Sequence, residues 1–377
     1  MIASQNNIPK LRFPEFGDGW EIKKLGEIFK ISAGGDIGIE NVSEIKTNIY
    51  QYPIYANAEK RKGFYGYSDI YKIEENVVTV AGRGVNIGIA HARNHKFYPI
   101  VRLLVLKPTN QENIYFFEYQ INNLNLLKES TGVPQLTAPQ ISGYSISFPS
   151  LPEQQKIATF LSTVDEKLQA IKKKKSLLET YKKGVMQKLF SQQIRFKDDD
   201  GNDFEDWEMM KLGEICKITI GEFVIKTKQN PNGKYPVFNG GKTYTGLYDE
   251  FNNEGNKIII SARGANAGFV NFQSEKYWAG NSCYSISVKD EKIYSIKYFF
   301  FYIKMFENRF LENQQAANIP SVSKKDTEMF EIEIPFLPEQ IKIANFLTAI
   351  DEKITKVDFQ IKQMELWKKG LLQQMFV

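Results

Sequence analysis

A segment of about forty residues occurs twice in this chain of 377 residues, and it constrains the fold more than any other feature. The first copy begins with Leu-Pro-Glu-Gln at Leu151 and runs to Phe190. The second copy begins with the same four residues at Leu337 and runs to Phe376. About 18 of 41 aligned positions are identical by direct count, which is typical of a true internal repeat.

Both copies have the apolar pattern of a long helix that packs against another helix. Apolar residues recur every seven positions, with a second set interleaved at steps of four and three, over about four heptads. Pro152 and Pro338 suit the first turn of a helix, where the N–H that proline lacks would be unpaired in any case. Forty helical residues make a rod roughly 60 Å long. The predicted helix-pairing residues are Ile157, Leu161, Val164, Leu168, Ile171 and Leu178 in the first copy and Ile343, Leu347, Ile350, Ile354, Val357 and Ile361 in the second.

The stretches before the two rods also repeat, more loosely. The Leu-Gly-Glu-Ile that begins at Leu25 recurs at Leu212, and the Arg-Gly-x-Asn-x-Gly that begins at Arg83 recurs at Arg263. Short β-rich runs ending in turns alternate with helix-spaced apolar segments, which predicts two α+β domains. The predicted boundaries are 1–150 for the first domain, 151–191 for the first spacer helix, 192–336 for the second domain and 337–377 for the second spacer helix.

The order domain, rod, domain, rod favours one arrangement of the two helices. If they pair antiparallel, as a coiled coil, the end of each rod reaches the other globular domain. We therefore predict antiparallel pairing, with the two halves related by a pseudo-twofold axis.

Composition narrows the possible classes of protein. The net charge is +5 and the pI about 8.8, which is compatible with nucleic-acid binding but indicates little by itself. Two cysteines are too few for a disulfide framework and favour a cytoplasmic location. The polar N-terminus lacks the apolar region of a signal peptide, and no run is long enough to span a membrane.

No catalytic or metal-binding motif stands out in the sequence. The only histidines, His91 and His95, lack partners at the spacing of metal ligands. Gly241-Lys242-Thr243 has the ending of a phosphate-binding loop, but Pro236 stands where the leading glycine should be. A turn in a β-rich domain is the better interpretation of that segment.

The repeated Leu-Pro-Glu-Gln helices, the paired Leu-Gly-Glu-Ile openings and the paired Arg-Gly turns together resemble the specificity subunit of type I restriction-modification enzymes. The resemblance covers nearly the whole chain. It implies a non-catalytic subunit with two target recognition domains, each reading one half of a bipartite, asymmetric site in double-stranded DNA. It also implies two methyltransferase subunits and restriction-translocase subunits as partners. S-adenosylmethionine, ATP and Mg²⁺ would act in those partners and not in this chain.

Candidate DNA contacts fall into two sets. Arg83, Asn86, Arg263 and Asn266 recur in both domains, so they cannot supply different base preferences; they fit phosphate contact or turn structure. Base reading should lie where the domains differ, chiefly residues 35–51, 57–67 and 90–97 against 222–234, 239–251 and 270–277. Arg–guanine and Gln or Asn–adenine pairs are the usual major-groove contacts. The remaining candidates are Lys60, Arg61, Lys62, Arg93, Gln135, Lys242, Thr243, Asn271, Gln273 and Gln314.

Two other functions stay open from the residues alone. One is a self-contained restriction-methylation enzyme, which requires a nucleotide or metal site; the other is a coiled-coil scaffold, which does not explain two elaborate domains. The lysine run 172–175 is interpreted as a solvated helix face. Lys182 and Lys368 stand at matching positions of the two rods, and their stems should follow the apolar stripe with the charges outside. The sequence does not determine the DNA target.

Overall fold

The chain folds into two compact units. The computed structural model describes residues 7–58, 60–124, 126, 135–312 and 320–377. The first unit combines residues 1–172 with 359–377, and the second is residues 173–358. Each unit therefore holds one globular part, the start of one long helix and the end of the other, whereas the predicted boundaries treat each helix as a segment of its own.

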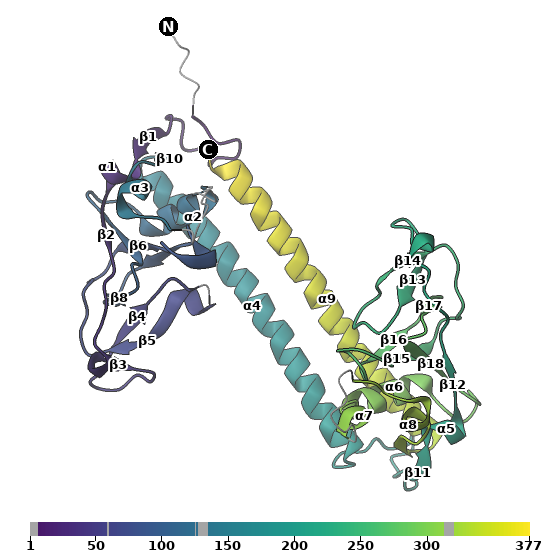
Figure 1. Ribbon diagram of the computed structural model, residues 1–377. Coiled ribbons are helices and arrows are strands. Elements are labelled where there is room, and N and C mark those ends of the chain that lie inside the picture. The colour runs from purple at the N-terminus through teal and green to yellow at the C-terminus, as the bar shows by residue number, and fades with distance from the viewer. Residues whose placement is uncertain (1–6, 59, 125, 127–134, 313–319) are drawn as a thin grey trace. The chain divides into compact units, whose positions relative to one another are not determined.

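The first unit is α+β, as predicted (Figure 1). Its helices and strands are β1 (Glu21–Lys24), α1 (Leu25–Ile28), β2 (Phe29–Ala33), β3 (Val42–Ser43), β4 (Tyr52–Tyr55), β5 (Phe64–Ser68), β6 (Val77–Val80), β7 (Ala90–Arg93), β8 (Tyr98–Pro99), β9 (Leu104–Pro108), α2 (Ile114–Asn123), α3 (Ala138–Ser142), β10 (Ser145–Phe148) and the start of α4 (Leu151–Phe190). Short 3-10 turns are η1 (Ile39–Asn41), η2 (Lys60–Gly63) and η3 (Gly84–Asn86).

Two four-stranded sheets and a short ladder organise this unit. The strand orders are β2-β9-β6-β7 and β3-β5-β4-β8, and β1 pairs antiparallel with β10. Helix α2 packs on β6 and β7, because it buries Phe116, Phe117 and Ile121 on one side. Asn113 begins this helix by accepting hydrogen bonds from two backbone N–H groups of the first turn, both at 3.0 Å.

The second unit repeats the same plan. Its elements are β11 (Glu208–Lys211), α5 (Leu212–Ile215), β12 (Cys216–Ile220), η4 (Lys226–Lys228), β13 (Tyr235–Phe238), β14 (Gly246–Tyr248), β15 (Lys257–Ser261), β16 (Val270–Gln273), β17 (Trp278–Ala279), β18 (Cys283–Val288), α6 (Ile296–Met305), α7 (Arg309–Glu312), α8 (Lys324–Glu328), β19 (Glu331–Ile334) and α9 (Leu337–Met375). The order β12-β18-β15-β16 matches β2-β9-β6-β7, and β11 pairs with β19 as β1 pairs with β10. The internal repeat is thus a repeat of fold.

Both long helices form, with α4 ending at Phe190 as the sequence predicts. Within the first unit the start of α4 runs antiparallel to the end of α9. Asp165 pairs with Lys368, and Lys172 lies 2.6 Å from Glu365, so residue numbers rise along one helix and fall along the other. The ring of Phe376, just after α9, packs against Trp20.

The second unit shows the same antiparallel pairing. Lys182 of α4 lies 2.6 Å from Asp351 of α9, and Lys175 lies 2.5 Å from Asp358. Phe190, at the end of α4, packs against rings of α6. The prediction that each rod ends on the other globular part is confirmed within each unit. The pseudo-twofold axis stays a prediction.

The predicted apolar stripe is buried along most of its length. Nine of its residues are buried, namely Ile157, Leu161, Val164, Leu168, Ile343, Leu347, Ile350, Val357 and Ile361. Ile171, Leu178 and Ile354 are half-buried. Lys175 is half-buried and forms an ion pair, so the interpretation of the lysine run as a solvated face is wrong for this residue. Lys172 also forms an ion pair.

Candidate nucleic-acid interface

The Leu-Pro-Glu-Gln motif fastens each long helix to its globular part. The Glu153 side chain is 1% exposed and accepts hydrogen bonds from Arg12 Nε and Nη2, both at 2.7 Å, and from Trp20 Nε1 at 3.4 Å. The bond to Glu153 raises the pKa of Arg12 above its ordinary value. A buried carboxylate needs such partners, because its desolvation is otherwise unfavourable. The first helix of the pair is thereby held at a fixed point on the first unit.

The second unit repeats this arrangement with the equivalent residues. Fully buried Glu339 accepts hydrogen bonds from Arg195 Nε and Nη2 at 3.2 and 2.8 Å and from Trp207 Nε1 at 3.1 Å. The glutamine of the motif is also buried in both units and bonds the backbone next to α2 or α6. The motif therefore has a structural role, to orient a globular domain on a rod.

The two Arg-Gly turns follow β6 and β15 and have the same conformation. Gly84 and Gly264 have φ of 78° and 89°, a left-handed backbone that glycine adopts without strain. Asn86 Nδ2 donates to the carbonyl of the Asn57 residue, and Asn266 Nδ2 donates likewise to a backbone carbonyl in its own unit, both at 3.4 Å. The side chains of both asparagines are therefore used in turn structure.

The arginines of these turns differ from the asparagines in their contacts with the described residues. Arg83 is half-buried and Arg263 is exposed, and among the described residues neither guanidinium forms a hydrogen bond or ion pair. Guanidinium groups at matching positions of two domains fit phosphate contact, which positions a protein on DNA without reading sequence.

The other candidates lie on several elements. Lys62, Gln135, Lys242 and Thr243 are exposed, whereas Asn271 and Gln273 are half-buried on β16. Asn271 Nδ2 donates to the backbone carbonyl of Lys242 at 3.0 Å, so it supports the loop after β13. The backbone of Lys60 and Arg61 lies in η2 beside Lys62. Gln314 lies outside the described residues.

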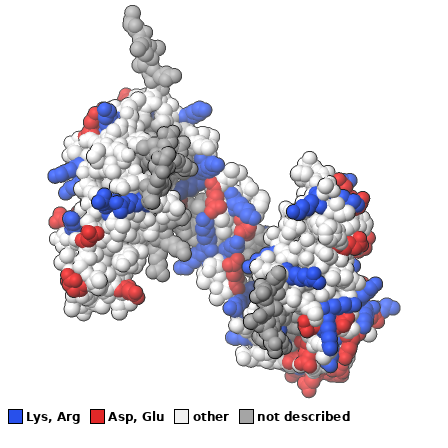
Figure 2. Space-filling model, in the orientation of Figure 1, with Lys and Arg blue, Asp and Glu red and all other residues white. Residues whose placement is uncertain are grey.

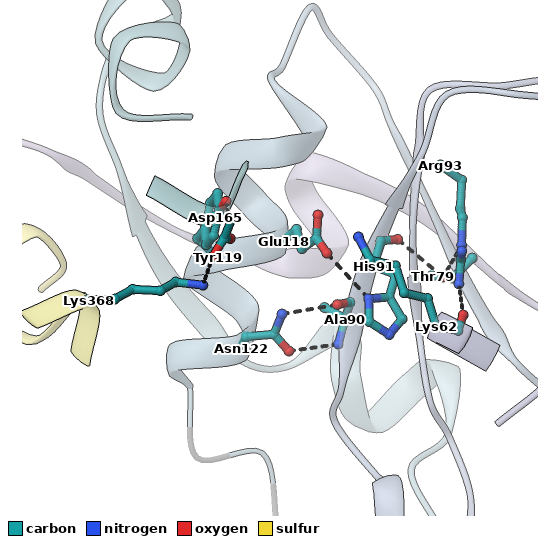
Figure 3. Close-up of polar contacts among 10 residues, drawn as sticks. All are labelled: Lys62, Thr79, Ala90, His91, Arg93, Glu118, Tyr119, Asn122, Asp165 and Lys368. Atoms are coloured by element: carbon teal, nitrogen blue, oxygen red, sulfur yellow. Dashed lines mark hydrogen bonds and ion pairs between the residues drawn. The ribbon is translucent and has the colours of Figure 1, made fainter. Parts of the chain in front are cut away.

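Arg93, a predicted base contact, is buried in the structure, and its guanidinium contacts protein groups. The residue is 4% exposed, and burial lowers the pKa of its guanidinium from the ordinary value. Its Nε donates to Thr79 Oγ1 at 3.1 Å, its Nη2 donates to the carbonyl of Lys62, and its guanidinium lies 3.6 Å from the centre of the Tyr55 ring. Figure 3 shows the side chain between Thr79 and Lys62.

Helix α2 links the rods to strand β7 in the first unit (Figure 3). Tyr119 donates to Asp165 Oδ2 at 2.7 Å, and the same carboxylate pairs with Lys368. One residue back along α2, Glu118 lies 3.3 Å from His91 Nδ1 on β7. Asn122 bonds both backbone groups of Ala90, with distances of 2.8 and 3.0 Å. A continuous set of polar contacts therefore ties the paired helices to the sheet.

Exposed apolar side chains gather in the stretches where the two domains differ. In the first unit Ile39, Ile45 and Ile49 are 90%, 70% and 68% exposed, and in the second unit Phe223 is 72% exposed. Figure 2 shows Lys and Arg on the visible face of each unit, with Asp and Glu gathered near β11 in the second. Exposed apolar side chains suit contact with base edges, and basic side chains suit contact with phosphates.

The described part of the chain contains no cluster of metal-ligating side chains. Burial raises the pKa of the Cys216 thiol to about 12 and that of Cys283 to about 11, so neither is an activated nucleophile. The Gly241-Lys242-Thr243 segment connects the antiparallel strands β13 and β14, which confirms a turn and not a phosphate-binding loop. No described helix is both long enough and apolar enough to cross a membrane.

These features define a duplicated α+β recognition protein whose domains are fastened to paired helices. The family described as type I restriction modification DNA specificity domain matches the chain twice, over residues 17–180 and 204–364. The chain therefore belongs to this family, and the resemblance predicted from the repeated motifs is confirmed.

Relatives and solved structures agree with this assignment. A protein of Methanocaldococcus jannaschii assigned as the type I restriction enzyme MjaX specificity subunit is 27% identical, over 98% of this chain and 95% of that one. A type I specificity subunit of Mycoplasma pneumoniae is 35% identical over 146 residues, 38% of this chain and 40% of that one. The crystal structure of a type I restriction-modification S subunit from M. genitalium matches in fold with a TM-score of 0.72 and 18% identity, covering 98% of this chain and 99% of that one. A chain from a study of complex assembly and conformational transition of a type I system has a TM-score of 0.55 and 16% identity, with 96% and 97% covered.

Sequence reasoning missed the partners of the motif glutamates. Arg12 and Arg195 repeat along with Glu153 and Glu339, and this joint repetition was the signal available. It also missed that Lys368 pairs with Asp165, and that Lys182 pairs with Asp351, the matching aspartate of the second rod. Opposite charges at matching positions of both rods could have indicated it.

Proposed function

We propose that this chain reads a bipartite, asymmetric DNA site, one half with each globular domain. The observation that carries the proposal is the repeat itself: two domains of one fold have matching Arg-Gly turns next to loops that differ. Matching arginines supply phosphate affinity, and differing loops supply different base preferences. Each long helix is continuous, which supports a spacer of fixed length between the half-sites. If both domains approach one face of B-DNA, the half-site centres are about 10 bp apart.

The proposed partners are two methyltransferase subunits, one for each half of the chain, and restriction-translocase subunits. The repeat supports two equivalent docking places along the rods. Catalysis is assigned to those partners, with S-adenosylmethionine as the methyl donor and ATP with Mg²⁺ for translocation and cleavage. The chain itself orients DNA in this division of roles.

The test is DNA binding by the chain co-purified with a methyltransferase partner. A selection from a random library should yield two different short sequences with a constant spacer. Replacing Arg83 or Arg263 by Ala should weaken binding to all sequences and reduce the slope of log K against log salt by about one. Recovery of one continuous site, or affinity that does not depend on sequence, would contradict the proposal.

A further inference from the structure

Arg93 is a buried cation that forms no ion pair with any carboxylate in the described part of the chain. Its contacts are the Tyr55 ring, Thr79 Oγ1 and the backbone carbonyl of Lys62. Glu118 acts on it only at longer range. Burial of a charge is costly in free energy, and in the described part of the chain that cost is offset by these hydrogen bonds and by the contact with the Tyr55 ring.

The contact with Lys62 bears on the shape of the turn that precedes β5. Lys62 has φ of 54°, a left-handed backbone that is unfavourable for a side chain with a Cβ, and Gly63 follows with φ of 83°. Ala56 N donates to the carbonyl of Gly63 at 2.8 Å, which holds one end of the turn. Arg93 Nη2 holds the neighbouring carbonyl from inside the domain. The backbone of η2 (Lys60–Gly63) is thus fixed at two successive carbonyls.

The second unit has no such cation at the matching place. In the strand ladder Arg93 faces Val77, and in the second unit Gln273 faces Lys257 at the same register. Thr79 corresponds to Ile259, whose side chain cannot accept a hydrogen bond. The contact between a buried arginine and a basic turn is therefore specific to the first domain. Such a difference between the domains fits the different DNA base preferences proposed for them.

We propose that Arg93 is a positioning residue that sets the base preference of the first domain, by fixing the turn that carries Lys60, Arg61 and Lys62. This inference rests on the proposed function. Guanidinium is planar, stays charged and donates from several nitrogens, so it stacks on Tyr55 and holds two acceptors at once. A lysine has one nitrogen and cannot make the three contacts together.

The experiment uses the chain in complex with its methyltransferase partner, and a selection from a library of DNA. Arg93→Lys keeps the positive charge but removes the several donors of the guanidinium. Thr79→Val removes one of its acceptors. The strand should accept valine at this position, because Ile259 occupies the matching position of the second unit. Discrimination among bases at the first half-site should fall by about tenfold for Arg93→Lys, the size of one lost base contact, and by less for Thr79→Val. Preference at the second half-site and the salt dependence of binding should stay unchanged.

Lys30→Met is the matched control, since Lys30 is an exposed lysine of β2 in the same unit; it should leave both preferences unchanged. Hydrogen exchange of β6 and β7 checks that each variant folds. If Arg93→Lys speeds the exchange of these strands, the half-site discrimination of Thr79→Val decides whether the proposal holds. Unchanged discrimination at the first half-site, or an equal loss at both half-sites, would overturn the role of Arg93. A wild-type complex without any sequence preference would instead refute the proposed function.

Discussion

The buried glutamate of the Leu-Pro-Glu-Gln motif should control the stability of one unit at a time. In Glu339→Gln the amide can still accept one hydrogen bond, but its NH₂ group then faces N–H donors of Arg195 and Trp207, and the arginine loses its counter-charge. Breaking a buried ion pair by removing one partner costs about 3–5 kcal/mol. The Arg195 side chain is 20% exposed and water can partly solvate it, so we expect the lower end, about 3 kcal/mol.

Native-state hydrogen exchange is the suitable assay, because it reports opening free energies region by region in a protein of two units. A loss of about 3 kcal/mol corresponds to roughly 100-fold faster exchange of β11, β19 and the start of α9. Glu153→Gln should have the same effect on the first unit only. Glu352→Gln, at an exposed position of α9, is the control and should change stability by less than about 0.5 kcal/mol. Equal acceleration in both units, or none with Glu339→Gln, would refute the reasoning.

Three further outcomes are expected. Ile350→Asp should place a charge in the core of the second unit and lower its free energy of unfolding by several kcal/mol, measured by thermal and denaturant melts; an unchanged melt would contradict the seam assignment. Lys182→Asp should destabilise the helix pairing, and Asp351→Lys in the same chain should restore most of the loss, with a coupling of about 1 kcal/mol because both side chains are partly exposed. Cys216 and Cys283 should resist alkylation in the folded chain, because pKa values raised to about 12 and 11 leave at most about one thiol in a thousand ionised at pH 8; rapid labelling of native protein would show that the thiols are not buried.

Periodicity predicted the helices and their seam because both depend on local spacing. The seven-residue apolar repeat fixes which face of a helix is buried, and positions such as Leu161 and Leu347 are fully buried as expected. The repeat of Arg83 and Arg263 also predicted matching turns correctly. These features need no knowledge of what lies opposite in space.

The sequence could not show where long polar side chains find partners. Arg93 was predicted as a base contact because it lies in a stretch where the two domains differ, but on β7 it donates to Thr79 and its guanidinium stacks on Tyr55. Arg12 and Glu153 are 141 residues apart and meet only when the globular part docks on the helix. Such contacts depend on tertiary packing, which residue type alone does not determine.

The most direct measurement of the central claim is an exchange of residues 222–280 for the equivalent stretch of another domain of this family. The complex with its partner subunits would be assayed for its preferred DNA by library selection, before and after the exchange. We predict that one half-site changes, the other half-site is retained, and the spacer keeps its length, so that adding one or two base pairs to it abolishes binding. A change in both half-sites, or binding that tolerates the longer spacer, would contradict a chain that reads two half-sites with two independently specific domains.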